Sequence, residues 1–223
     1  GWARGLTGMR RTVALRMAES AALVAPVTLQ RDLDVTDLTA WATRRPPQAP
    51  GGVLDALLAL VARALVRHPD LNAHLLDTGI VEHDAVHLGY AVDGARGLVV
   101  PVVRDAAGLP VDELAERRRA LVTAARAGKL GPDDQDGATF TVTNLGPLGI
   151  DHFSPIVNLP QVAILGLGAF RSTLDVGDDD TPVVRRKVGV SLTFDHRAVD
   201  GAPAARFLDR LARTAADPFE LLA

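Results

Sequence analysis

Apolar residues recur at helical spacing in several parts of the chain. Between residues 53 and 67 they include Val53, Leu57, Val61 and Leu65, which predicts a helix with one face in the core. Pro69 ends this segment because proline cannot continue a helix. Helix-forming residues or similar spacing predict further helices over 8–19, 37–45, 111–128 and 202–216.

Other segments alternate apolar and polar residues, which is typical of strands. Such patterns predict strands over 26–35, 138–143, 162–170 and 183–194, and a hairpin of 87–92 and 98–103 about the turn 93–97. The acidic stretch 175–180 lacks the ligand spacing and final glutamate of a calcium loop, and we interpret it as a solvated hairpin tip. Because hairpins and helices follow one another without regular βαβ units, we predict a single α/β (α+β) domain over 1–223 with a mixed sheet.

Composition narrows the possible functions. The 223 residues are 48% hydrophobic and only 4% aromatic, so we expect a core of Leu, Val, Ala and Ile. The net charge of −3 and the lack of a basic stripe argue against nucleic acid as a partner. No cysteine is present, which excludes disulfides and a cysteine nucleophile. We expect no membrane span and a cytoplasmic location.

The segment 188–201 holds the strongest candidate for chemistry. Val188, Val190, Leu192 and Phe194 alternate, so His196 should fall on the same buried face just where the strand ends. A histidine there could act as a base, or could only satisfy a buried backbone group. Asp200 directly precedes the last helix and is suited to be its N-cap.

Other polar groups carry weaker signals. His83 and His87 would be too far apart along a strand to share a metal ion, so we predict no metal site; we place His74 in a loop. We interpret the arginines 117–119 as a solvated helix face. The chain lacks GxSxG, GxxxxGK[ST] and GxGxxG motifs, so a serine hydrolase or nucleotide-dependent enzyme has no support.

A family resemblance extends over nearly the whole chain. Residues 195–201, Asp-His-Arg-Ala-Val-Asp-Gly, resemble the DHRxxDG signature of the dihydrolipoamide acyltransferase (E2) catalytic domain of 2-oxoacid dehydrogenase complexes. Four further segments resemble that family in the same order: 9–17, 97–105, 139–146 and 155–166. The related chloramphenicol acetyltransferases share the His…Asp-Gly spacing but typically have a second histidine where this chain has Asp195.

The resemblance implies a chloramphenicol acetyltransferase-like fold, with a mixed sheet and flanking helices, assembled as trimers whose active sites lie between subunits. Trimers of the family can build cubic or icosahedral cores. The implied reaction moves an acyl group between a dihydrolipoyl thiol and coenzyme A. His196 would be the general base, Thr143 the donor to the oxyanion, and Asp200 the residue that orients Arg197 or His196. Without a cysteine, transfer would be direct, in a ternary complex.

Several points stay open at this stage. The lipoyl group and the E1 and E3 components would engage N-terminal domains that this chain lacks; either those domains precede Gly1 or the chain is a stand-alone relative. The coenzyme A ligands are unknown. Phe153-Ser154-Pro155 resembles acetyl or branched-chain members more than succinyl ones, and we expect acetyl. The alternatives are a free-standing coenzyme A-dependent acyltransferase with a soluble acceptor and a non-catalytic core scaffold.

Overall fold

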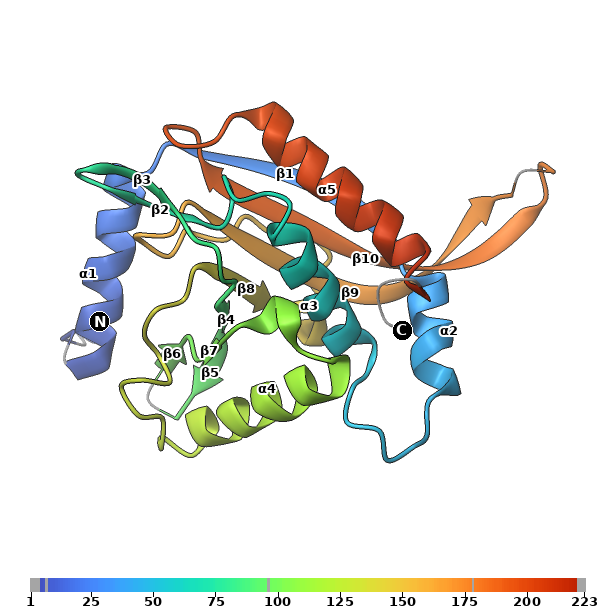
Figure 1. Ribbon diagram of the computed structural model, residues 1–223, viewed down its shortest axis with the longest axis horizontal. Helices are drawn as coiled ribbons and strands as arrows, with labels where there is room; N and C mark the ends of the chain where they lie inside the picture. Colours follow the sequence, from blue (N-terminus) through green and yellow to red (C-terminus); the bar gives the residue numbers. More distant parts are fainter. Residues whose placement is uncertain (1–4, 7, 96, 178, 220–223) are drawn as a thin grey trace, which may run out of the picture.

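The computed structural model describes residues 5–6, 8–95, 97–177 and 179–219. Its centre is a six-stranded mixed sheet (Figure 1) in the order β1 (Pro26–Asp34), β10 (Pro182–Asp195), β9 (Ala163–Val176), β8 (Phe140–Asn144), β4 (Leu88–Tyr90) and β7 (Val102–Val103). The β8 strand is parallel to both of its neighbours, whereas the other neighbouring pairs are antiparallel. The predicted mixed sheet is therefore confirmed.

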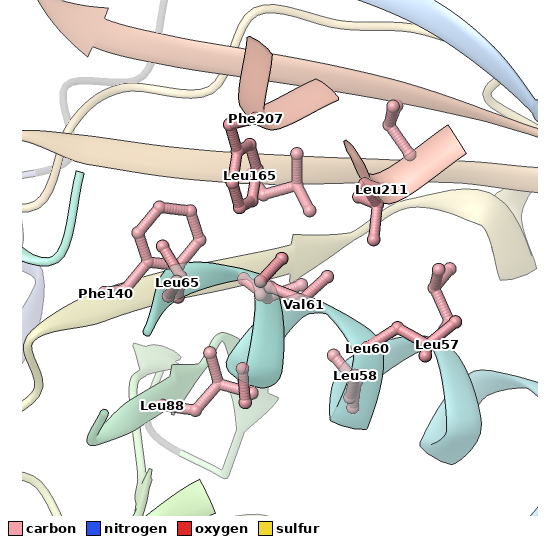
Figure 2. Packing of buried hydrophobic residues seen from close by; sticks show 14 of the residues in the cluster. Leu57, Leu58, Leu60, Val61, Leu65, Leu88, Phe140, Leu165, Phe207 and Leu211 are labelled. Atoms are coloured by element: carbon pink, nitrogen blue, oxygen red, sulfur yellow. The ribbon is translucent and has the colours of Figure 1, made fainter. Parts of the chain in front are cut away.

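Helices cover the sheet in the way that the apolar spacing predicts. The α3 helix (Val53–Leu65) and the α5 helix (Gly201–Ala216) pack over one face. Figure 2 shows Leu57, Val61 and Leu65 of α3 pointing toward the space shared with Phe207 and Leu211 of α5. Leu, Val and Ala dominate the core, with buried phenylalanines filling the larger gaps. The remaining helices are α1 (Gly8–Leu23), α2 (Thr36–Arg44), α4 (Val111–Arg126) and the short 3-10 turns Ala106–Gly108 and Gly146–Leu148.

The middle of the chain differs from the prediction. The expected hairpin is split: β4 pairs with β7 in the main sheet, while β5 (Val92–Gly94) pairs with β6 (Gly97–Val99) as a separate ribbon. Arg96 in the turn lies outside the described residues. A further hairpin, β2 (Ala73–Leu76) with β3 (Gly79–Glu82), was not predicted, and His74 lies in its first strand and not in a loop. Buried and exposed positions do not alternate along either strand of this hairpin, so the pattern that predicts strands was missing.

The long β9–β10 hairpin extends beyond the body of the molecule (Figure 1). β9 continues to Val176, six residues past the predicted end, because each additional residue pairs with β10. The predicted acidic tip is confirmed as a hairpin end; Asp178 within it lies outside the described residues. Among the described residues, no group of three or more His, Cys, Asp or Glu side chains could hold a metal ion, and no helix is long and apolar enough to cross a membrane.

The arginine run on α4 is not uniformly solvated, so that interpretation was wrong for Arg118. Its Nε donates a 2.7 Å hydrogen bond to Asp55, a carboxylate only 3% exposed on α3. Its guanidinium also lies over the Tyr90 ring, 5.3 Å from the centroid. Arg117 is half exposed, as predicted, and pairs with Glu113 one turn earlier. Helical spacing could not reveal a buried partner on a different helix.

Candidate functional site

His196 lies directly after β10, at the end of the sheet. Its backbone N–H donates to the carbonyl of Ala25, and its ring centroid lies 5.9 Å from that of Phe194. The side chain is 46% exposed, so the expectation of a buried face was wrong. Pairing with β1 ends at Asp195 and pairing with β9 ends at Phe194, and no later strand residue covers the imidazole. Half of this ring is therefore open to a substrate or a second chain.

Asp195 anchors the turn that presents His196. The carboxylate is 1% exposed and accepts hydrogen bonds from the backbone N–H groups of Ala25 and Arg197 and from the guanidinium of Arg197. Burial opposes the charged form, but these bonds, with those from Arg197 foremost, still hold the pKa of Asp195 below its usual value. Sequence reasoning missed this role. The signal was a carboxylate at the buried end of a strand, two residues before an arginine.

Asp200 occupies the N-cap position of α5, as expected, with extended backbone angles. Its carboxylate makes no side-chain capping bond and is 83% exposed. The Nδ1 atom of His196 lies 3.8 Å from Asp200 Oδ1, too far for a hydrogen bond. Asp195, and not Asp200, orients Arg197, so the Arg197 alternative was wrong, whereas orientation of His196 by Asp200 stays a prediction.

Thr143 lies on β8, in the row of the sheet opposite Gly166 of β9 and then Ser191 of β10. The neighbouring row, Val142 with Leu165 and Leu192, belongs to the core. Because side chains alternate along a strand, Thr143 points to the other face of the sheet, away from α3 and α5.

On that face Thr143 lines a pocket of about 340 Å³. The lining is mostly apolar and comes from α1, from the β6 region and from the segment 153–158. It comprises Thr12, Val13, Arg16, Met17, Ala91, Leu98, Val99, Val100, Gln135, Thr141, Thr143, Phe153, Pro155, Ile156, Asn158 and Ile164. A hydroxyl in a mostly apolar pocket is well suited to stabilise a developing oxyanion, because a hydrogen bond is worth more where water is excluded.

The chain does not bring His196 and Thr143 together. His196 lies five residues beyond Ser191, which is roughly 16 Å along β10. Two strand spacings add roughly 10 Å across the sheet. His196 is also absent from the lining of the Thr143 pocket. Within one chain, His196 and Thr143 are therefore too far apart to act on the same substrate bond.

Comparison with known proteins defines the class of this fold. The architecture is that of the chloramphenicol acetyltransferases: a solved structure of such an enzyme superposes with a TM-score of 0.53 over 89% of this chain and 92% of that one, at 12% identity. Residues 3–223 match the family model for the 2-oxoacid dehydrogenases acyltransferase (catalytic domain). The chain belongs to this family, and the predicted fold class is confirmed.

Individual relatives are similar over the whole chain. The dihydrolipoyllysine-residue acetyltransferase component of the acetoin cleaving system of Bacillus subtilis is 40% identical over 97% of this chain and 56% of its own length. A solved structure of the Azotobacter vinelandii dihydrolipoamide acetyltransferase superposes with a TM-score of 0.94 at 35% identity, covering all of this chain and 94% of that one. The cubic core of the pyruvate dehydrogenase multienzyme complex gives the same values. The chain spans about half the length of the curated relatives it matches.

Proposed function

We propose that this chain transfers an acyl group, acetyl in the first instance, between a dihydrolipoyl thiol and coenzyme A. The observation that carries the proposal is the division of the site: a threonine hydroxyl lines a mostly apolar pocket, and a half-exposed histidine lies elsewhere, in a turn anchored by a buried carboxylate. The A. vinelandii structure was studied for the roles of a serine, a histidine and an asparagine in catalysis. That histidine and asparagine are four positions apart, as His196 and Asp200 are here.

The chemistry follows from the groups available. A thiol has a pKa of about 8.5 and an imidazole about 6.5, so neutral His196 can accept the thiol proton as the sulfur attacks the thioester carbonyl. The carbonyl oxygen becomes an oxyanion, to which the Thr143 hydroxyl donates a hydrogen bond. Collapse breaks the original carbon–sulfur bond, and the departing thiolate takes the proton back from the imidazolium. Asp200 would keep the imidazole in position through Nδ1.

Separation of the two groups supports a site that is shared between subunits. We propose a homotrimer in which His196 of one subunit reaches the Thr143 pocket of the next. A structure this similar to the cubic core of a multienzyme complex is compatible with further assembly of trimers. The part of the relatives that this chain does not span would then carry the lipoyl group and the contacts with E1 and E3.

The pocket favours a small uncharged acyl group. Gly166 lies beside Thr143 in the sheet, and the Phe153 ring lies directly over it: a Cβ on Gly166 would be 2.8 Å from Phe153 Cζ. Arg16 and Gln135 line the pocket as well as two neighbouring hollows. A succinyl carboxylate beside the Phe153 ring would lose hydration at the apolar part of the lining, which favours a smaller, uncharged acyl group.

The test is an acyl-CoA panel assayed with free dihydrolipoamide. We expect wild-type protein to use acetyl-CoA in preference to succinyl-CoA, and His196→Ala to retain its assembly state while losing turnover. Arg213→Ala, which changes an exposed side chain on α5, is the matched control and should behave as wild type. No thiol transfer with any acyl-CoA by correctly assembled wild-type protein would refute the proposal.

A further inference from the structure

Three glycines form a flat area on the Thr143 face of the sheet, and the segment 151–153 lies directly on it. A Cβ on Gly168 would be 1.9 Å from the carbonyl oxygen of Asp151, and a Cβ on Gly189 would be 2.3 Å from the same atom. Real Cβ atoms do not approach that closely. The third glycine, Gly166, lies under the Phe153 ring. Only a strand surface without side chains allows this segment so close to the sheet.

A hydrogen bond of the His152 side chain helps to hold this segment on the sheet. Its Nε2 lies 3.0 Å from Asp32 Oδ1 on β1, and Asp32 Oδ2 accepts a 2.7 Å bond from Arg171 on β9. Burial favours the neutral form of Asp32, but Arg171 and then His152 hold its pKa below the usual value. The carboxylate is therefore an acceptor, and Nε2 of His152 donates to it. The ring also lies against Gly189, whose Cβ would be 2.7 Å from Cε1.

The hydrogen bond between His152 and Asp32 lies one residue before a wall of the pocket. Phe153 follows His152 directly, and its ring fills the space over Gly166 next to Thr143. A backbone hydrogen bond of 2.8 Å from Ala169 to Ile150 and a 3.5 Å bond from Arg171 to the Asp151 carboxylate fix the start of the segment, and His152 fixes it immediately before Phe153. Loss of the His152 hydrogen bond would let the segment lift and the Phe153 ring move away from the sheet.

We propose that His152, held by Asp32, is a positioning residue that sets the length of acyl chain the pocket accepts, by keeping Phe153 against Gly166. The proposal rests on the proposed function, since it concerns the pocket assigned to the acyl group. His152 does not touch the reacting atoms; it acts through the phenylalanine. A hydrophobic pocket discriminates one methylene by about 10-fold or more, so a displaced ring should be visible as altered selectivity.

The experiment compares kcat/KM for acetyl-CoA and butyryl-CoA, with dihydrolipoamide as acceptor. We expect His152→Ala to lower the acetyl-to-butyryl ratio by about tenfold, mainly through better use of butyryl-CoA. His152→Gln, whose amide can donate to Asp32, should keep a ratio near that of wild type. Asp209→Asn is the control. It removes the 3.2 Å ion pair between Asp209 on α5 and Arg31, the neighbour of Asp32 on β1. The acetyl-to-butyryl ratio of this variant should equal that of wild type.

A merely structural role for His152 predicts a different pattern. His152→Ala would then lower the melting temperature and both kcat/KM values together, leaving their ratio unchanged, and that result would overturn the inference. A crystal structure of His152→Ala tests the geometry without catalysis. The Phe153 ring should leave Gly166; an unmoved ring would also overturn the inference. If the wild-type protein is inactive, the proposed function is refuted. The position of the Phe153 ring in the His152→Ala structure would still test whether His152 positions Phe153.

Discussion

The ion pair between α3 and α4 allows one prediction to be worked through in detail. Replacing Arg118 with Met keeps most of the side-chain volume but removes the charge that faces Asp55. That carboxylate is 3% exposed and receives its 2.7 Å bond from Arg118. Removing one partner of a buried ion pair typically costs about 3–5 kcal/mol, because the other charge is left uncompensated.

Two features place the expected loss at the lower end of that range. The backbone N–H of Gly52 still donates to Asp55 at 3.1 Å, and Arg119 lies 4.0 Å away on the same helix. We therefore expect the free energy of unfolding to fall by about 3 kcal/mol. For a chain of this size, that lowers the melting temperature by about 6–12 °C.

The assay is urea unfolding and a thermal melt at one fixed protein concentration, since assembly contributes to stability. Arg117→Met is the matched control: its pair with Glu113 is half exposed and should be worth about 0.5 kcal/mol or less. The double variant Arg118→Met/Asp55→Asn should recover part of the lost free energy of unfolding, because the unpaired buried carboxylate of Asp55 is then replaced by a neutral amide. Equal losses in Arg118→Met and Arg117→Met would refute this reasoning.

Three further predictions concern the site and its pH dependence. Thr143→Ser should keep most of the activity and Thr143→Val should lose about 10²-fold or more in kcat; equal activity in the two would remove the hydroxyl from the mechanism. His196→Ala should lower kcat by about 10²–10⁴ with unchanged assembly, so wild-type turnover in that variant would exclude His196 as the base. Burial, followed by the charges of His74 and His87, lowers the pKa of His83. The unfolded chain therefore binds the proton more tightly, and stability should decline as the pH falls below about 6.5. In His83→Gln, urea unfolding should show a shallower decline; an unchanged slope would contradict this.

The periodic parts of the fold could be predicted because one strong signal determined each of them. Helix α3 carries apolar residues at helical spacing and has ten of its thirteen residues buried, and β10 alternates apolar and polar residues over its eight buried positions. The β2–β3 hairpin could not be predicted, because β3 is exposed throughout and β2 is partly buried without alternation, so neither strand carries a period-2 pattern. The partner of Arg118 was hidden for a related reason: Asp55 lies 63 positions away, and no local pattern links the two.

Residues for the site could be proposed from the sequence, but their arrangement in space could not. Family motifs singled out His196, Thr143 and Asp200, and the structure puts Thr143 in a pocket and His196 at a strand end. Alternation placed His196 on a buried face, yet pairing ends one residue earlier and leaves the ring half exposed. The importance of Asp195 and His152 depends on contacts with Ala25 and Asp32, which lie more than a hundred positions away in the chain.

The most direct test of the account is activity from two inactive chains. His196→Ala and Thr143→Val chains are co-expressed in equal amounts, and mixed trimers are identified by mass spectrometry. In a cyclic trimer every interface is the same head-to-tail contact, so each mixed trimer has a single interface that joins an intact His196 to an intact Thr143. Random mixing should then restore about a quarter of wild-type activity. Mixed trimers no more active than either parent would contradict the shared site.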